Sequence, residues 1–414
     1  MLIYAIFETD DPFIHDMNEN SQKMTRQELR ASASLALIFF LRMFGLFMIL
    51  PVLSLYTGDM VGATPLLVGL AIGVYGLTQA LLQIPFGMIS DHLGRKPVIA
   101  AGLLIFVIGS VIAAMAESIH ILILGRALQG AGAIAASIMA LAADLTRENQ
   151  RTKAMAIIGI SIGMAFTLAF IGGPVLDIWL GLSGLFWAAA LLGIIALIVL
   201  FTWVPHPDHF EFHPEAETES RSFLAVLKNA DLLRLDASIL ILHLVLTASF
   251  VVLPLALRDH AGLPSEQHWK IYLPVMLLSV VLMAPFVRIA DKRDLGKPLF
   301  IGSILLLATA EFGLWQAYSS TLWLAAMMLV FFTAVNYLEA ALPSMVSRSA
   351  PAERKGTALG VYSTSQFLGA FVGGTLGGWL YGKTGIGGVF MANGIIILIW
   401  FLISLPMRVQ TTKR

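Results

Sequence analysis

The stretch GMISDHLGRKP, residues 87–97, places a cluster of charged and glycine residues between two long apolar segments. The segments on either side, near 66–90 and 97–116, contain no Asp, Glu, Lys or Arg. Each is at least as long as the roughly 20 apolar residues with which a helix crosses a bilayer. The stretch therefore predicts a short, charged turn at a membrane surface that joins two membrane-spanning helices.

The composition extends this interpretation to the whole chain. Of the 414 residues, 58% are hydrophobic and only 13% are charged, which is about half the charged share of a soluble domain. The mean hydropathy is +0.83. We expect an all-α membrane protein with twelve transmembrane helices, near residues 34–56, 66–90, 97–116, 120–144, 154–177, 183–204, 235–257, 270–290, 298–318, 321–346, 357–381 and 386–406.

The basic residues predict how the chain is oriented, because Lys and Arg gather in cytoplasmic loops. With a cytoplasmic N-terminus, 21 of the 26 Lys and Arg residues fall in inside segments and three fall in outside loops. The other two, Arg42 and Arg126, lie within spans. Since the number of spans is even, we expect both termini to be cytoplasmic.

The longest polar stretch, 205–234, divides the chain into two groups of six spans. Similar charged breaks recur about 200 residues apart, with DHLGRKP at 91–97 matching DKRDLGKP at 291–298. This offset is typical of a duplicated six-span unit. The expected regions are a cytoplasmic tail 1–33, with Met1, Met17 or Met24 as its start, a six-helix bundle 34–204, a cytoplasmic linker 205–234, a pseudo-symmetric bundle 235–406 and a cytoplasmic tail 407–414.

The charged connection resembles the signature of the major facilitator superfamily, at Gly87, Asp91, Gly94, Arg95 and Lys96. The resemblance covers all the spans and implies the major facilitator fold. It also implies a charge relay on the cytoplasmic face, in which Arg95 pairs with Asp144 at the end of span four. Asp91 would lie near the N-terminus of span eleven, where the helix dipole favours an anion. The alternative is that these charges only fix the topology.

Span four contains LGRALQGAGAIAAS, residues 124–137, and places Arg126 inside the membrane. A charge there costs several kcal/mol and usually serves a function. Gln129 and Gly130 lie about one turn away on the same face. The resemblance implies that Arg126 faces a central cavity and assists proton coupling. The alternative is an arginine that extends to the outer surface of the membrane.

Span five ends in Gly172, Gly173 and Pro174, which resemble the end of the superfamily's antiporter motif. The glycine-rich body of that motif is partly present, as Gly159 and Gly163, so the pattern favours antiport. Small residues also recur every four positions in spans five and eleven, a pattern that suits close helix contact. We expect these stripes at the interface between the two halves; they are Ser161, Ala165, Ala169 and Gly173, and Ser365, Gly369, Gly373 and Gly377.

The remaining ionisable groups within spans are Arg42, His243, Glu311 and Glu339. Carboxyl groups inside a bilayer are protonated or paired, which makes them candidate proton carriers. Glu339, with Asn336 and Tyr337 beside it, is the stronger candidate for a cavity. Glu311 could equally satisfy a neighbouring helix. For His243 we favour a packed histidine over a proton carrier.

The resemblance implies a drug:proton antiporter of the bacterial inner membrane, which exports a hydrophobic or amphipathic small molecule by alternating access. The proton gradient would supply the energy, with no cofactor and no metal. Its expected partners are the substrate and the lipid bilayer, with no nucleic acid, and the expected state is a monomer. The transporter type that the sequence resembles includes members with a soluble domain after the last span. We do not expect that domain in the given sequence, in which span twelve ends near residue 406.

Two alternatives belong to other functional classes. An uptake carrier or facilitator for a sugar or other metabolite would need several polar side chains converging in its cavity, whereas these spans are dominated by apolar residues. A membrane receptor that does not transport would have no use for matched charged connections in both halves. An enzyme is not expected, because the sequence has no cysteine, no phosphate-binding loop and no nucleophile–base arrangement.

Overall fold

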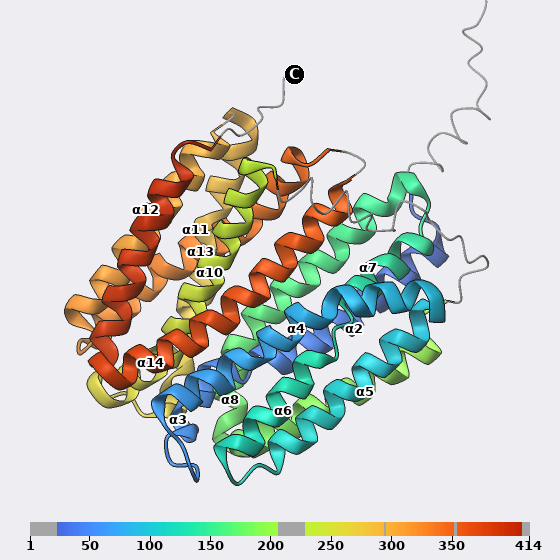
Figure 1. The fold of residues 1–414 in the computed structure, drawn as a ribbon. Coiled ribbons are helices and arrows are strands. Elements are labelled where there is room, and N and C mark those ends of the chain that lie inside the picture. Colours follow the sequence, from blue (N-terminus) through green and yellow to red (C-terminus); the bar gives the residue numbers. More distant parts are fainter. Residues whose placement is uncertain (1–22, 206–227, 294, 352–353, 408–414) are drawn as a thin grey trace, which may run out of the picture.

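The computed structural model describes residues 23–205, 228–293, 295–351 and 354–407, which form a bundle of helices (Figure 1). A π-helical turn at Ala256–His260 and a 3-10 turn at Ser265–Gln267 connect two of them. The helices are α2 Arg26–Phe47, α3 Leu50–Thr57, α4 Pro65–Leu93, α5 Arg95–Ala114, α6 Ile119–Ala131, α7 Ala135–Asp144, α8 Glu148–Thr202, α10 Ala230–Leu255, α11 Trp269–Arg293, α12 Gly296–Ala317, α13 Thr321–Ser349 and α14 Lys355–Ser404.

These helices confirm the predicted all-helical membrane fold. In the described part of the chain, ten helical segments are long and apolar enough to cross a membrane. Two of them, α8 and α14, have 55 and 50 residues and change direction at Gly181 and Gly385. The φ angles there are 62° and 72°, which glycine adopts without the strain that a side chain would add. Dividing both helices at these glycines gives the twelve expected spans.

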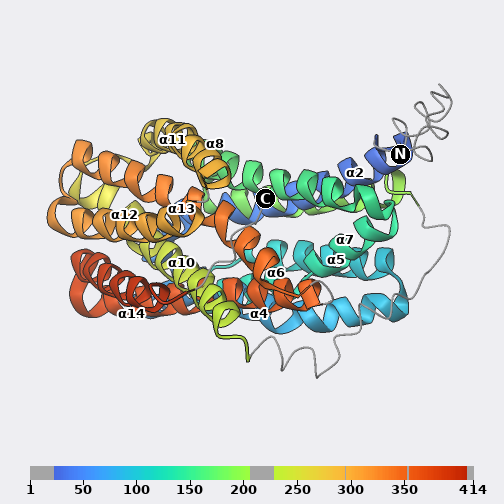
Figure 2. The same cartoon turned by 90° about the horizontal axis from the view of Figure 1, so that it is seen from above.

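The helices form two groups, α2 to α8 and α10 to α14, with α4 and α14 side by side between them (Figure 1). Glycines make this contact close: a Cβ atom added to Gly374 of α14 would lie 2.6 Å from the carbonyl oxygen of Gly69 in α4. Seen from above, α8 also lies beside α11 (Figure 2). Spans two and eleven, and spans five and eight, therefore meet between the halves.

The small-residue stripes, however, contact helices of their own half. An added Cβ on Gly173 of α8 would lie 2.1 Å from the carbonyl oxygen of Met48, which follows α2. Added Cβ atoms on Gly369 and Gly373 of α14 would meet carbonyl oxygens of α10 at 2.1 and 2.2 Å. The expectation that these stripes lie at the interface between halves is wrong. Span eleven contacts span two through the neighbouring row that holds Gly374 and Gly378.

The close contacts between the two halves lie toward one end of the molecule. We call the end with the connection at Gly94 the inner end and the opposite end the outer end. At the outer end, Arg258 of the second half donates from Nη1 to the Leu55 carbonyl oxygen at 3.1 Å, and the Phe170 and Phe250 ring centroids lie 4.6 Å apart.

Glycines of α8 and α14 toward the inner end have no such close neighbour. Added Cβ atoms on Gly159 and Gly163 of α8, and on Gly356 and Gly360 of α14, would meet no atom within 4 Å. The same helices pack closely on other helices toward the outer end, so the close contacts between the halves are concentrated there. With the predicted orientation, contacts concentrated at the outer end are those expected of an inward-facing arrangement.

Candidate functional site

The charged connection is a turn of one residue. Helix α4 ends at Leu93 and α5 begins at Arg95, with Gly94 between them at a φ of 92°. Such a φ strains any residue with a side chain, which explains a glycine at this position. Arg95 forms an ion pair with Asp91, and its Nε donates to Asp144 Oδ2 at 3.2 Å. The structure thus places Arg95 against the partner expected for it.

The connection is further tied to its surroundings by Ser90 and Lys96. Ser90 Oγ accepts from Arg95 Nη1 at 2.8 Å and donates to the Gly87 carbonyl oxygen at 2.7 Å. Lys96 Nζ donates to the carbonyl oxygen of Val204 at 2.6 Å, just past the C-terminal end of α8, where the helix dipole favours a cation. Asp91 pairs with Arg95 in this structure, and its expected approach to the N-terminus of span eleven stays a prediction.

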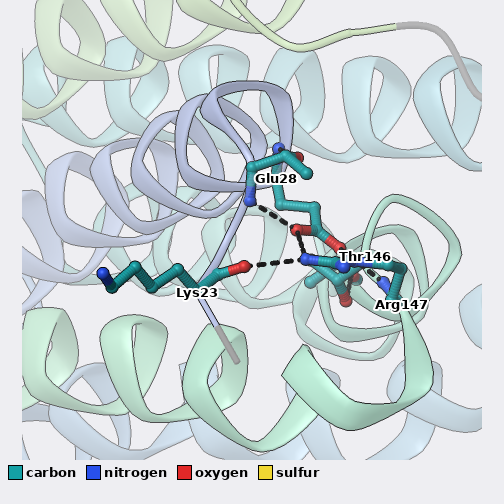
Figure 3. Close-up of polar contacts among 6 residues, drawn as sticks. Lys23, Glu28, Thr146 and Arg147 are labelled. Carbon is teal, nitrogen blue, oxygen red and sulfur yellow. Dashed lines mark hydrogen bonds and ion pairs between the residues drawn. The ribbon is translucent and has the colours of Figure 1, made fainter. Parts of the chain in front are cut away.

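A further ion pair at the inner end was missed by the sequence interpretation (Figure 3). Glu28, only 5% exposed, accepts from the Nε and the backbone N of Arg147 at 2.8 and 2.9 Å. Arg147 also donates to the Lys23 carbonyl oxygen at 2.8 Å. The start of span one is therefore bound to the connection between spans four and five. The sequence signal for it was the T-x-x-E capping box at 25–28.

Arg42 lies fully buried within the first half. Its Nη2 donates to Gln79 Oε1 and to the Gly132 carbonyl oxygen, both at 2.8 Å. Span four is interrupted between α6 and α7, which takes the Gly132 carbonyl out of the regular helical hydrogen-bond pattern and lets it accept from Arg42. An added Cβ on Gly132 would lie 2.2 Å from the Gly102 carbonyl oxygen, so the close approach of α5 requires glycine.

Arg126 is also buried and does not extend to the surface. Its Nη1 donates to Gln129 Oε1 at 2.7 Å, and its Nε donates to the Ala71 carbonyl oxygen at 3.2 Å. Gln129 is held in turn by Nε2, which donates to Ser110 Oγ at 2.8 Å. The predicted pair of Arg126 and Gln129 is thus one hydrogen-bonded unit that joins spans two, three and four.

The second half holds a histidine–carboxylate pair. His243 of α10, for which the sequence favoured a packed role, lies with Nε2 2.6 Å from Glu339 Oε1 of α13. The Nε2 atom of Gln366 in α14 approaches the same His243 nitrogen at 2.8 Å. Three spans therefore meet at one imidazole nitrogen. Gln366 was missed from sequence, although an amide in an apolar span was a signal for it.

Glu311 belongs to a different network. Its carboxyl group is fully buried and accepts from Ser249 Oγ at 2.6 Å, while Asn393 Nδ2 donates to Ser249 Oγ at 3.0 Å. Asn336 Nδ2 donates to Ser279 Oγ at 2.9 Å, and Tyr337 is buried in the core. The carboxyl-bearing residues of the second half are thus not gathered into one cluster.

The expected antiporter motif contacts span one. Gly173 approaches the Met48 carbonyl oxygen, and an added Cβ on Gly172 would lie 3.1 Å from the Phe44 ring. This contact falls where span one is interrupted between α2 and α3. Pro174 is buried within α8, whereas Gly159 and Gly163 have no neighbour beside them.

Twelve spans in two related halves, with charged connections at the inner end and arginines buried in the first half, define a secondary membrane transporter. In agreement, the Major Facilitator Superfamily matches the sequence over residues 35–374 and, in a second match, over residues 237–414. The chain belongs to this superfamily. It is therefore a multi-pass membrane transporter of small molecules rather than an enzyme.

Individual relatives and solved structures extend the comparison. The inner membrane transport protein YajR of Escherichia coli (strain K12) is 46% identical over 389 residues, which cover 94% of this chain and 86% of YajR. The multidrug resistance protein MdtH of Yersinia pestis (strain Pestoides F) is 26% identical over 349 residues, which cover 82% of this chain and 84% of MdtH.

Two solved structures share the fold. A bacterial homolog of the human lysosomal transporter Spinster matches with a TM-score of 0.77 at 13% identity, covering 94% of this chain and 100% of that one. The human organic anion transporter MFSD10 matches with a TM-score of 0.70 at 19% identity, covering 92% of this chain and 100% of that one.

Proposed function

We propose that this transporter is a proton-coupled antiporter that exports a hydrophobic or amphipathic small molecule by alternating access. The observation that carries the proposal is the contact of His243 with Glu339, at 2.6 Å within the membrane. The two side chains are 15% and 33% exposed, so the pair is neither on the surface nor sealed in the core. An ionisable pair of this kind within a bilayer is a candidate proton site.

The two contacts of His243 Nε2 suit different proton positions. With a proton on Nε2, the ring donates to Glu339 Oε1. Without it, the single lone pair of Nε2 accepts either from the Gln366 amide or from a proton on the Glu339 carboxyl group. One proton can thus reside on either group. Because α10, α13 and α14 meet here, its arrival or departure can bias how these spans pack.

Buried aromatic side chains join the halves near the outer end, and their exposure when the halves part would favour a hydrophobic substrate. Phe170 of the first half lies against Phe250 and Phe332 of the second, at 4.6 and 6.0 Å between ring centroids. Aromatic side chains bind apolar ligands with large contact areas. The name of the related MdtH, a multidrug resistance protein, is consistent with this substrate class.

The proposal includes the location and state of the protein. We place it in the bacterial inner membrane, as the name of YajR states for that relative, and treat it as a monomer with the regions expected from sequence. Both termini are cytoplasmic in this proposal, because 21 of 26 Lys and Arg residues then lie inside.

A vesicle assay tests the coupling. Growth inhibition of a deletion strain and an overexpressor, with a panel of amphipathic dyes and antibiotics, selects the compounds. In everted vesicles, each selected compound should release protons that report as dequenching of a pH-sensitive dye. Collapsing the pH gradient while keeping the voltage should weaken transport.

Variants make the assay specific. Glu339→Gln and His243→Gln should lose the dependence on the pH gradient, whereas Lys270→Gln, at an exposed position in the first turn of α11, should behave as wild type. Transport indifferent to both pH gradient and voltage would identify a facilitator and refute the proposal.

A further inference from the structure

The membrane interior of the first half is positively charged. Spans one to six contain Arg42 and Arg126 but no acidic residue away from their ends. The acidic groups of this half lie at span ends, as Asp91, Asp144 and Asp177 do. Among the described residues, no ion pair joins either arginine to a carboxylate. Two buried cations without counter-charges are costly in a bilayer.

Several hydrogen-bond donors near Arg42 are buried without an acceptor. Arg42 uses Nη2 for Gln79 and Gly132, while its Nε and Nη1 have no partner among the described residues. The same holds for Gln79 Nε2 and for the hydroxyl of Tyr75. An unpaired buried donor loses its hydration without compensation. Unused donors thus surround the charge that already lacks a counter-ion.

Both arginines lie against one aromatic ring. The guanidinium carbons of Arg42 and Arg126 are 5.9 and 5.5 Å from the Tyr75 ring centroid. Cation–π contact offsets part of the cost of burying each cation, but it supplies no negative charge. The Tyr75 ring also lies edge-on to Phe367 of α14, with centroids 6.3 Å apart. The Tyr75 ring therefore contacts both cations and a residue of the other half.

We propose that Arg42, Arg126, Gln79 and Tyr75 bind an acidic group of the transported compound, which makes the substrate an amphipathic anion. This inference rests on the proposed export of an amphipathic molecule. A carboxylate or similar group would supply the missing charge and accept from the unused donors, and charge-assisted hydrogen bonds to guanidinium are among the strongest in proteins. Access would come when the halves rock and Tyr75 moves from Phe367.

The acidic residues of the second half determine how the bound substrate is oriented. The membrane interior there contains Glu311 and Glu339, so an acidic substrate group is disfavoured beside them. We therefore orient the acidic end toward the first half and the apolar body toward Phe170 and Phe250, which must part from each other to admit it.

Matched probes test this site at equilibrium, without any gradient. Naphthalene-2-carboxylate, naphthalene-2-carboxamide and 2-naphthylmethylammonium share a ring system and differ in charge. Their affinities for the full-length protein in phosphatidylcholine nanodiscs can be obtained from dose-dependent shifts of the thermal midpoint. We expect the carboxylate to bind about tenfold or more tightly than the amide or the ammonium. Equal binding, or no binding of the carboxylate, would overturn the proposal.

Variants locate the effect. Arg42→Gln and Arg126→Gln should each abolish the preference for the carboxylate. Arg42→Lys and Arg126→Lys keep the positive charge and should keep part of the preference. The lysine variants therefore still test the site if a glutamine variant fails to fold. Lys383→Gln, an exposed residue of α14, should retain the full preference. A preference that survives in both glutamine variants would overturn the assignment.

The lipid composition and the absence of a gradient separate a substrate site from a lipid site and from the proton-coupling proposal. Adding anionic phosphatidylglycerol to the nanodiscs should leave the carboxylate affinity unchanged; a loss would assign the site to lipid headgroups and overturn its role for a substrate. Because no gradient is present, failed proton coupling in vesicles would leave these affinities unaffected, and the two proposals fail separately.

Discussion

Substituting Gly374 by alanine should shift the transporter away from the inward-facing arrangement. Gly374 lies where α14 crosses α4, and an added Cβ would be 2.6 Å from the Gly69 carbonyl oxygen and 2.8 Å from the Gly73 nitrogen. These neighbours are backbone atoms, which cannot rotate away. Ordinary contact begins at about 3.4 Å, so the helices must separate by roughly 0.8 Å.

The size of the effect follows from overpacking. An extra methyl group in a tightly packed contact costs about 1–3 kcal/mol. Because α4 and α14 belong to different halves, opening the outer end relieves this cost without unfolding either half. The cost therefore acts on the equilibrium between conformations, and the ratio of inward-facing to other states should fall about 5- to 150-fold.

Distances between spin labels measure the shift. The chain has no cysteine, so pairs can be introduced at Val61 and Lys383 for the outer end and at Leu93 and Lys355 for the inner end, all exposed. Gly374→Ala should lengthen the outer distance and shorten the inner one.

The control is Gly302→Ala, which gains the same helix propensity at a position with no atom within 4 Å. It should leave both distance distributions unchanged. If Gly374→Ala also gave wild-type distributions, the claim that this contact exists only in the outer-closed state would be wrong.

Three further predictions concern the charged residues. Glu28→Gln should lower the free energy of unfolding by about 1–3 kcal/mol because Arg147 loses a buried acceptor. The control Glu148→Gln, at an exposed position, should change the free energy of unfolding little. Equal thermal midpoints for both variants would show that the ion pair contributes nothing to stability. Asp91→Asn should raise the inward-facing population and slow turnover. The carboxylate is expected to interact with the N-terminal dipole of α14 when the inner ends close, which stabilises the closed inner end by about 0.3–1 kcal/mol. Unchanged cross-linking between cysteines introduced at those ends would contradict this prediction. Arg126→Ala should abolish coupled transport with the protein still inserted, and wild-type proton release in vesicles would exclude a coupling role.

Much of the fold could be predicted from the sequence because membrane insertion depends on local properties. A span needs a run of apolar residues, and a charge is costly wherever it enters the bilayer. The spans on either side of 87–97 and the buried Arg126 were therefore visible in single segments. The bends at Gly181 and Gly385 were not, since a glycine between two apolar runs does not reveal its backbone angles.

The contacts between segments were decided only by the tertiary structure. A stripe of small residues indicates that some helix can approach closely, but not which one, and the stripes of spans five and eleven turned out to pack within their own halves. His243 and Glu339, 96 residues apart, could be recognised as ionisable but not paired, and neither Gln366 nor the contact of Glu28 with Arg147 was anticipated. Pairing depends on how helices rotate and cross, which is set by the summed packing of the whole bundle. Conformations of a transporter can differ by only a few kcal/mol, so composition and spacing do not determine which arrangement of the two halves is the stable one.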